Sequence, residues 1–153
     1  MPRVSRSRVI DASLARVWDL VADPYSLPRW WPRATRVEDV REEGAGLHSW
    51  TTVMTTGQGT PVRADYRCSA LESGVRLRWE QEVEGTPFER ILNRSAVEIA
   101  LAPEGEATKL TLTADETLRG LARLGAPMIG GAARRRLDET LDGIEQALVE
   151  RRT

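Results

Sequence analysis

The sequence predicts an α+β fold in which one antiparallel sheet of about seven strands packs against a long C-terminal helix. Three observations support this. Apolar and polar residues alternate from Thr35 to Leu118, which is the period of strands. A helical period returns between Gly120 and Arg152, and a strand with two short helices precedes the alternating region. Only the C-terminal helix is long enough to cover the apolar face of such a sheet. A chain of 153 residues has the size of one domain, so we expect a single domain over residues 1–153.

The composition is that of an ordinary globular protein, with 41% hydrophobic and 29% charged residues. The formal net charge of −1 argues against a dedicated nucleic-acid-binding protein, which is expected to be basic. No apolar run approaches the roughly 18 residues of a membrane span. The N-terminus lacks the apolar segment of a secretion signal, so we expect a cytoplasmic protein.

Cysteine and histidine occur once each, as Cys68 and His48. A single cysteine forms no internal disulfide, and a zinc site would lack its usual set of ligands. Any catalytic triad would have to use His48. The sequence therefore implies no metal and no organic cofactor.

The N-terminal segment predicts a strand followed by an amphipathic helix. Residues Val4–Ile10 alternate loosely, as in a strand. The apolar residues of the next segment then fall at i, i+3, i+4 and i+7, on one stripe of a helix: Leu14, Val17, Trp18 and Val21. Ser13 or Asp11 can cap this helix. Pro24 disfavours helical geometry at the residue before it, so the helix is expected to end there.

A second, short helix carries two adjacent tryptophans. Pro28 is suited to its first position, and Pro32 closes it. Trp30 and Trp31 cannot face the same way on a helix. We expect one of them to pack in the core and the other to lie at the rim of a cavity or in solvent. The alternative is that both pack the short helix onto the sheet.

Turn signals such as "EEGAG", "ESG" and "APEGEA" divide the alternating region into strands joined in a meander. One predicted strand places five residues on one face: Val62, Ala64, Tyr66, Cys68 and Ala70. The next strand does the same with Val75, Leu77, Trp79, Gln81 and Val83. A later strand pairs Leu110 with Leu112 on its apolar face. In "HSWTTVMTT" two registers remain open, one that groups His48, Trp50 and Met54, and one that groups Leu47, Thr51 and Val53.

The C-terminal helix has a strong apolar stripe at spacings of 4, 3 and 4, formed by Leu137, Leu141, Ile144 and Leu148. Its first half contains Pro127 and the glycine pair Gly130 and Gly131, so we expect irregular helix there. Met128 and Ile129 lie where this softer half would cross the mouth of a cavity. The alternative is an ordinary kinked helix that is packed shut.

Two motifs carry a resemblance to a known family. "VIDASLARVWDLVADPYSLPRWWP" (Val9 to Pro32) and "ARRRLDETLDGIEQAL" (Ala133 to Leu148) resemble the opening and closing segments of the START-like, or SRPBCC, helix-grip superfamily. The likeness is strongest to its polyketide cyclase/dehydrase and lipid-transport branch. The resemblance implies a curved sheet wrapped round the long helix, with an apolar cavity between them that is entered near the short second helix. Members bind lipids, isoprenoids or polyketides, and some catalyse cyclisation or aromatisation.

These considerations give a set of expected ligand-binding residues, which are Trp30, Trp50, Met54, Tyr66, Trp79, Met128 and Ile129. Tyr66, Glu116 and His48 are the candidates for proton transfer if the protein is an enzyme. Structural interpretations stand beside these roles: Glu116 near a strand end can reach water, and a lone histidine is more often structural. Cys68 is interpreted as a small buried hydrophobe, and Arg134–Arg136 as a solvated helix face.

The expected function is the binding of a small hydrophobic ligand in the internal cavity, with a small apolar molecule as partner and no nucleic acid. One alternative is a polyketide cyclase or aromatase that uses the same cavity. Another is a protein-interaction module of a toxin–antitoxin or stress system, in which the apolar surface near Trp30 and Trp31 would contact a partner protein. No protein partner is otherwise indicated.

Overall fold

The fold was determined as a computed structural model that describes residues 3–44, 47–55, 59–86, 92–118 and 126–150; within these ranges the side chains of residues 92–93, 117–118, 126–132 and 150 are outside the description. The elements follow in the order β1 (Arg3–Ile10), α1 (Leu14–Val21), the 3-10 helix η1 (Pro24–Ser26), α2 (Leu27–Trp30), β2 (Ala34–Glu42), β3 (His48–Thr55), β4 (Pro61–Glu72), β5 (Arg76–Gln81), β6 (Leu92–Glu104), β7 (Ala107–Leu118) and α3 (Ala126–Glu150).

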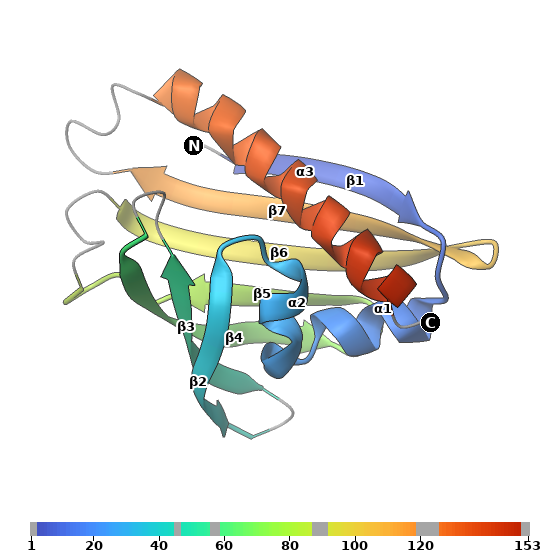
Figure 1. Ribbon diagram of the computed structural model, residues 1–153, viewed down its shortest axis with the longest axis horizontal. Helices are drawn as coiled ribbons and strands as arrows, with labels where there is room; N and C mark the ends of the chain where they lie inside the picture. The colour runs from blue at the N-terminus through green and yellow to red at the C-terminus, as the bar shows by residue number, and fades with distance from the viewer. Residues whose placement is uncertain (1–2, 45–46, 56–58, 87–91, 119–125, 151–153) are drawn as a thin grey trace.

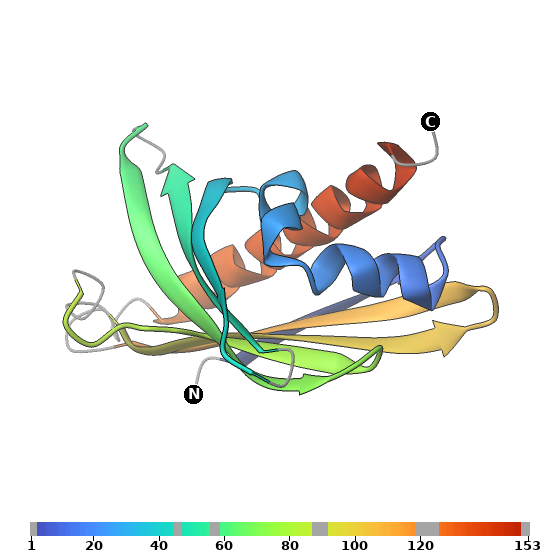
Figure 2. The same ribbon diagram turned by 90° about the horizontal axis from the view of Figure 1, so that it is seen from below.

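The strands form one seven-stranded sheet in the order β1-β7-β6-β5-β4-β3-β2, with antiparallel pairing between neighbours. Consecutive strands from β2 to β7 are neighbours, as in the predicted meander, and β1 closes the order beside β7. Figure 1 shows α3 crossing the sheet diagonally. Figure 2 shows the sheet bending through β2, β3 and β4, with the helices on its concave side. This confirms the predicted helix-grip arrangement.

The short helices begin and end where local chemistry requires. The Ser13 hydroxyl accepts a hydrogen bond from the Arg16 backbone N–H at 3.3 Å and so caps α1. The Asp23 carboxylate accepts one from the Tyr25 N–H at 3.0 Å and caps η1, in which Pro24 occupies the first turn. Pro28 occupies the first turn of α2. The two prolines therefore start new helical turns and allow the chain to bend between α1 and α2.

Two details of the sheet differ from the sequence-based expectation. The β4–β5 register shifts between Cys68 and Ala70, so Ala70 leaves the face of Tyr66 and is exposed. Val75 precedes β5 and is 43% exposed. Of the two registers left open for β3, the structure has the one that places Trp50 opposite Tyr66 and Met54 opposite Val62.

The backbone of α3 is helical without interruption from Ala126 to Glu150, whereas an irregular first half was expected. The physical reason lies in the position of Pro127, which is the second residue of the helix. A proline in the first turn breaks no intrahelical hydrogen bond, because its N–H would have no partner there. The penalty for Gly130 and Gly131 is about 1 kcal/mol each, which a helix of this length can absorb.

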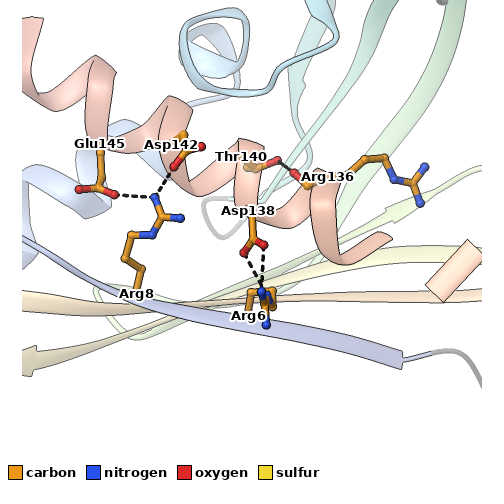
Figure 3. A network of polar contacts seen from close by, with 7 residues as sticks. All are labelled: Arg6, Arg8, Arg136, Asp138, Thr140, Asp142 and Glu145. Carbon is orange, nitrogen blue, oxygen red and sulfur yellow. Dashed lines mark hydrogen bonds and ion pairs between the residues drawn. The ribbon is translucent and has the colours of Figure 1, made fainter. Parts of the chain in front are cut away.

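The C-terminal half of α3 is held on the sheet by an apolar stripe and by ion pairs. Leu137, Leu141, Ile144 and Leu148 are at most 3% exposed. On the β1 side, Arg6 donates to both carboxylate oxygens of Asp138 at 2.9 Å. Arg8 reaches Asp142 and Glu145, each at 2.6 Å (Figure 3). Because the edge strand contributes arginines at positions that pair with Leu112 and Leu110, its concave face binds α3 through charge.

The α2 helix packs against α3 without an intervening side chain. A Cβ atom placed on Gly143 would lie 2.3 Å from the carbonyl oxygen of Trp30, so only glycine fits this contact. The packing fixes α2 between α3 and β2. Among the described helices, none is long and apolar enough to cross a membrane.

Candidate functional site

A cavity of about 10 Å³ lies between α2 and the concave face of the sheet. The six side chains that line it are Leu27, Trp31, Trp50, Thr52, Tyr66 and Trp79. Such a volume is close to the minimum needed for one water molecule. A larger ligand must therefore displace part of the wall.

Trp79 lies at the centre of an aromatic cluster around this cavity. Its ring centroid is 5.2 Å from that of Trp50, 5.7 Å from that of Trp30 and 6.0 Å from that of Trp31. Trp50 in turn stacks on Tyr66, with centroids 6.1 Å apart and planes at 14°. These rings pack against one another, so their faces and edges become available to a ligand only when the cavity opens.

The polar groups of the cavity wall include the Trp50 indole N–H and the Tyr66 hydroxyl. The Trp50 Nε1–H donates to the Thr52 hydroxyl at 3.0 Å, so this indole already has a partner. Burial raises the pKa of the Tyr66 phenol; the negative charge of Glu116 raises it further, while the positive charge of Arg136 lowers it. Tyr66 is therefore a neutral hydroxyl at physiological pH, able to donate or accept a hydrogen bond.

Four polar side chains form a row across the concave face, which we call the polar row: Tyr66 of β4, Gln81 of β5, Ser95 of β6 and Glu116 of β7. Tyr66 pairs directly with Gln81, and Ser95 pairs directly with Glu116. Gln81 lies one step beyond the last β5–β6 pair, Glu80 with Ala96, which places it beside Ser95. Directly opposed residues of antiparallel strands project from the same face.

The polar row has a partner on α3. Arg136 Nη2 lies 3.7 Å from Glu116 Oε1. Figure 3 shows the Arg136 side chain pointing away from Arg6 and Arg8, the arginines that tie α3 to β1. By contrast, the neighbouring row of the same face is apolar through Trp79, Val97 and Ala114. The charged and polar groups are thus collected in one row, whose end at Glu116 and Arg136 is partly exposed, with side chains 25% and 42% exposed.

A groove of about 370 Å³ lies outside the cavity, between α2 and α3. Its walls are formed by Pro28, Arg29, Trp30, Trp31, Pro32, Glu139, Asp142, Gly143 and Gln146. Trp31 lines both the groove and the cavity, and its side chain is half-buried. This indole therefore forms a partition between the two spaces.

The structure brings together some of the expected ligand-binding residues and separates others. Trp50, Tyr66 and Trp79 line the cavity. Trp30 is 1% exposed and belongs to the core, while its neighbour Trp31 takes the place at the cavity wall. Met54 shares the face of Trp50 and is half-buried, without lining this cavity. Met128 and Ile129 lie in α3, but their side chains are outside the described residues. A binding role for any of these residues stays a prediction.

The three candidates for proton transfer lie in two places. Tyr66 and Glu116 belong to the polar row. His48 is the first residue of β3, where it pairs with Glu42 of β2, and it does not line the cavity. Cys68 is buried, and its thiol donates to the Ala70 carbonyl at 3.2 Å. In the described part of the chain no three His, Cys, Asp or Glu side chains are grouped so that they could hold a metal ion.

Sequence reasoning missed Leu27 and Thr52 on the cavity wall, and Gln81 and Arg136 near Tyr66. For Trp31 it left open which of the two adjacent indoles would face the cavity. For Gln81 a signal existed, because the alternation placed this amide on the apolar face of Trp79, where a polar residue needs an explanation. For Arg136 the run of three arginines concealed the one whose side chain pairs with Glu116. Arg134 and Arg135 are exposed, as a solvated face would be.

The chain is similar to a known protein family and to several solved structures. Residues 1–149 match the family model described as polyketide cyclase / dehydrase and lipid transport. No curated protein matches. Solved structures include the protein TTHA0849 from Thermus thermophilus, with 23% identity, a TM-score of 0.80 and coverage of 99% of this chain and 100% of that one. The Zhui aromatase/cyclase from Streptomyces sp. R1128 has 20% identity, a TM-score of 0.78 and coverage of 99% and 95%. A START superfamily protein from Mycobacterium smegmatis has 14% identity, a TM-score of 0.80 and coverage of 97% of both chains.

Proposed function

The chain belongs to the polyketide cyclase/dehydrase and lipid transport family, and from this premise we propose that it binds a small, mainly apolar molecule between its curved sheet and α3. The observation that carries the proposal is the aromatic wall built by Trp31, Trp50 and Trp79 around an internal space. Among the described residues of that wall, hydroxyl groups come from Thr52 and Tyr66. A cytoplasmic location belongs to the same proposal, in keeping with the free, buried thiol of Cys68.

Burial of apolar area would drive this binding, at about 25 cal/mol for each Å² removed from water. The free-energy cost of opening the cavity offsets part of this gain, since the space of about 10 Å³ must expand to admit a ligand. The half-buried Trp31 is the wall residue that can move at least cost, because its other side faces the groove between α2 and α3. Entry near α2 is also what the family resemblance implies.

Native mass spectrometry of the protein as purified from cells is the first test, followed by extraction of anything bound. The second is titration of the tryptophan fluorescence with a fatty acid, farnesol and a hydroxylated anthraquinone. We expect saturable binding of at least one of them. An empty protein that binds no member of the panel would contradict the proposal.

A pair of matched variants separates cavity binding from adsorption to the surface. Thr52→Leu adds bulk directly to the cavity wall and is expected to weaken binding at least tenfold. Thr55→Leu makes the same change at the exposed end of the same strand and should leave binding unchanged. Equal binding by both variants would place the ligand elsewhere.

A second candidate function, a cyclase or aromatase, is favoured by the neutral Tyr66 phenol in the same row as Glu116. In an aldol cyclisation Glu116 would take a proton from a methylene carbon, and Tyr66 would donate one to the attacked carbonyl oxygen as the carbon–carbon bond forms. In the loss of water that follows, Glu116 returns its proton to the departing hydroxyl and Tyr66 takes the second proton from the former methylene carbon, which forms the double bond and restores both groups. General acid–base catalysis of this kind typically raises the reaction rate by about 10²- to 10⁴-fold.

The enzyme hypothesis is tested with a synthetic poly-β-ketone thioester, following the absorbance of the aromatic product. Tyr66→Phe and Glu116→Gln should each lower the rate by about a hundredfold. Arg134→Gln, an exposed change on α3, serves as the control. If the thioester binds tightly but forms product no faster than in the uncatalysed reaction, the cyclase or aromatase function is excluded and the binding function is retained.

The interaction-module alternative gains no support from the tryptophans. It expected exposed indoles near α2, but Trp30 is 1% exposed and Trp31 is half-buried. Their contacts are with each other and with Trp79. An internal ligand accounts for this placement better than a partner protein does.

A further inference from the structure

The Nε2 atom of Gln81 is a buried hydrogen-bond donor without a partner. It is one of two such side-chain atoms in the described part of the chain, the other being Trp30 Nε1. Resting on the proposed function, we propose that the Gln81 amide is the specificity-determining group of the cavity and selects ligands that carry a neutral oxygen acceptor, such as a ketone, over hydrocarbons of the same shape.

The position of Gln81 connects it to the cavity wall. It lies directly opposite Tyr66 on β4 and two residues after Trp79 on the same face of β5. Both of these neighbours line the cavity. A ligand that rests on the aromatic wall therefore lies within one side chain of the unpartnered amide. An oxygen at that end of the ligand would accept the hydrogen bond that the protein itself does not supply.

An unpartnered buried donor calls for a physical explanation. Leaving such a group without a hydrogen bond costs about 1–3 kcal/mol, and native proteins contain few of them. A methionine or leucine at this position would fill similar space without the cost. The amide is therefore unfavourable in the free protein and becomes favourable when an acceptor is bound.

The surrounding charges select a neutral acceptor over an anion. Glu116 and Arg136 lie 3.7 Å apart as an ion pair of opposite charge, so the polar row offers no net positive charge that would hold a carboxylate or phosphate ligand. The amide of Gln81 and the neutral hydroxyl of Tyr66 instead match a carbonyl or phenolic oxygen.

The test uses two probes, tetralin and 1-tetralone. They differ in one group, because 1-tetralone has a ketone where tetralin has a methylene. Dissociation constants are measured by tryptophan fluorescence for the wild-type protein and for Gln81→Met, with Gln81→Leu as a second apolar variant. Since the hydrocarbon is more hydrophobic, the measured quantity is the ratio of the two constants within each protein. We expect the preference for the ketone to fall about tenfold in both variants.

Two further measurements distinguish a structural role of Gln81 from a role in ligand recognition. The carbonyl stretching frequency of bound tetralone should be lowered in the wild-type protein and should rise in Gln81→Met, because the hydrogen bond is lost. The ligand-free Gln81→Met protein should unfold at a temperature equal to or above that of wild type. Glu80→Met, on the opposite face of the same strand, is the control and should change neither the ratio nor the frequency.

The outcomes distinguish the two proposals. If both probes bind and the ratio is the same in wild type and in the Gln81 variants, the role of Gln81 is overturned while cavity binding stands. If neither probe binds, the proposed function fails and this inference fails with it. If the ratio falls and the carbonyl frequency shifts as described, the amide is the acceptor-recognising group.

Discussion

At the scale of single residues, the adjacent indoles Trp30 and Trp31 have different tasks. Trp30 is 1% exposed and packs on Trp79, whereas Trp31 is half-buried between cavity and groove. Trp30→Ala should lower the free energy of unfolding by about 3–5 kcal/mol, the usual cost of emptying a fully buried aromatic site. Trp31→Ala should cost about 2 kcal/mol or less, because part of its surface already faces water.

The rate of ligand association should also distinguish the two variants, but here Trp31→Ala should have the larger effect. Removal of the Trp31 indole joins the cavity to the groove, so the association rate of farnesol in stopped-flow fluorescence should rise relative to wild type. Trp30→Ala lacks this effect, since Trp30 does not line the cavity. An unchanged association rate in Trp31→Ala would show that the ligand enters by another route.

The sequence could determine that these two indoles differ, but not which one is which. Residues at i and i+1 on a helix point about 100° apart, which predicts one inward and one outward side chain. The choice depends on how α2 rotates onto α3, and that is set by the contact between Gly143 and the Trp30 carbonyl. A contact between residues this far apart in the chain leaves no local pattern.

At the scale of elements, the close packing of α2 on α3 requires a glycine at position 143. Gly143→Ala would improve helix propensity by about 1 kcal/mol in an exposed helix. Here the new methyl group would lie 2.3 Å from the Trp30 carbonyl oxygen, which forces α2 to move. Overpacking of this kind costs typically 1–3 kcal/mol, so we expect a net loss of stability in urea unfolding, together with weaker ligand binding.

A control for the Gly143 variant is Glu139→Ala, an exposed position one turn earlier in α3. Surface changes of this type are usually within about 0.5 kcal/mol of neutral. If Gly143→Ala were as stable as Glu139→Ala or more so, the close contact between the helices would not be present in solution.

The ion pairs between β1 and α3 predict a dependence of stability on pH. The hydrogen bonds and positive charge of Arg6 hold the pKa of Asp138 below its ordinary value. A lowered pKa in the folded state stabilises the fold above the unfolded-state pKa of about 4, and this contribution is lost as the pH falls through the folded-state pKa. The unfolding free energy, measured in urea between pH 7 and pH 3, should therefore decrease toward acid.

Arg6→Met should flatten this acid dependence without abolishing it, because Glu38 has a lowered pKa of the same kind from Arg36 and Arg63. The difference between wild type and Arg6→Met should be small and should shrink in 0.5 M NaCl, since the pair is exposed. An identical pH profile for the two proteins would mean that the pair does not form in solution.

Alternation of polar and apolar residues was enough to predict the strands, since each faces the core on one side only. It did not predict the register shift after Cys68, which moves Ala70 to the exterior, because a bulge changes pairing without changing composition. Nor could it predict the size of the cavity. That volume depends on how Trp31, Trp50 and Trp79 pack against one another, which no spacing rule specifies.

At the scale of the whole molecule, the cavity and the contacts that anchor α3 to β1 lie in different parts of the fold. The cavity and the polar row occupy the concave face of the sheet, with the cavity under α2, whereas β1 and the C-terminal half of α3 are tied by charge and by the leucine stripe. A ligand bound as proposed would therefore act on the part of the fold under α2, while the ion pairs and the leucine stripe hold α3 on the sheet. Both unpartnered donors identified among the described side chains belong to neighbours of the cavity wall: Trp30 packs on Trp79, and Gln81 lies opposite Tyr66.

Ligand binding should stabilise the fold as a whole, because the cavity exists only when sheet and helices are assembled. At a hundredfold excess over the dissociation constant the gain is about 2.7 kcal/mol, which corresponds to a rise of roughly 5–10 °C in Tm for a chain of 153 residues. Differential scanning fluorimetry with the best ligand of the panel measures this shift. Hydrogen exchange should slow in α2, β3, β4 and β5, and stay unchanged at the β6–β7 turn around Gly105, which lies far from α2 in Figure 1. A shift that persists undiminished in Thr52→Leu, or protection spread evenly over all strands, would argue against a ligand held in the cavity.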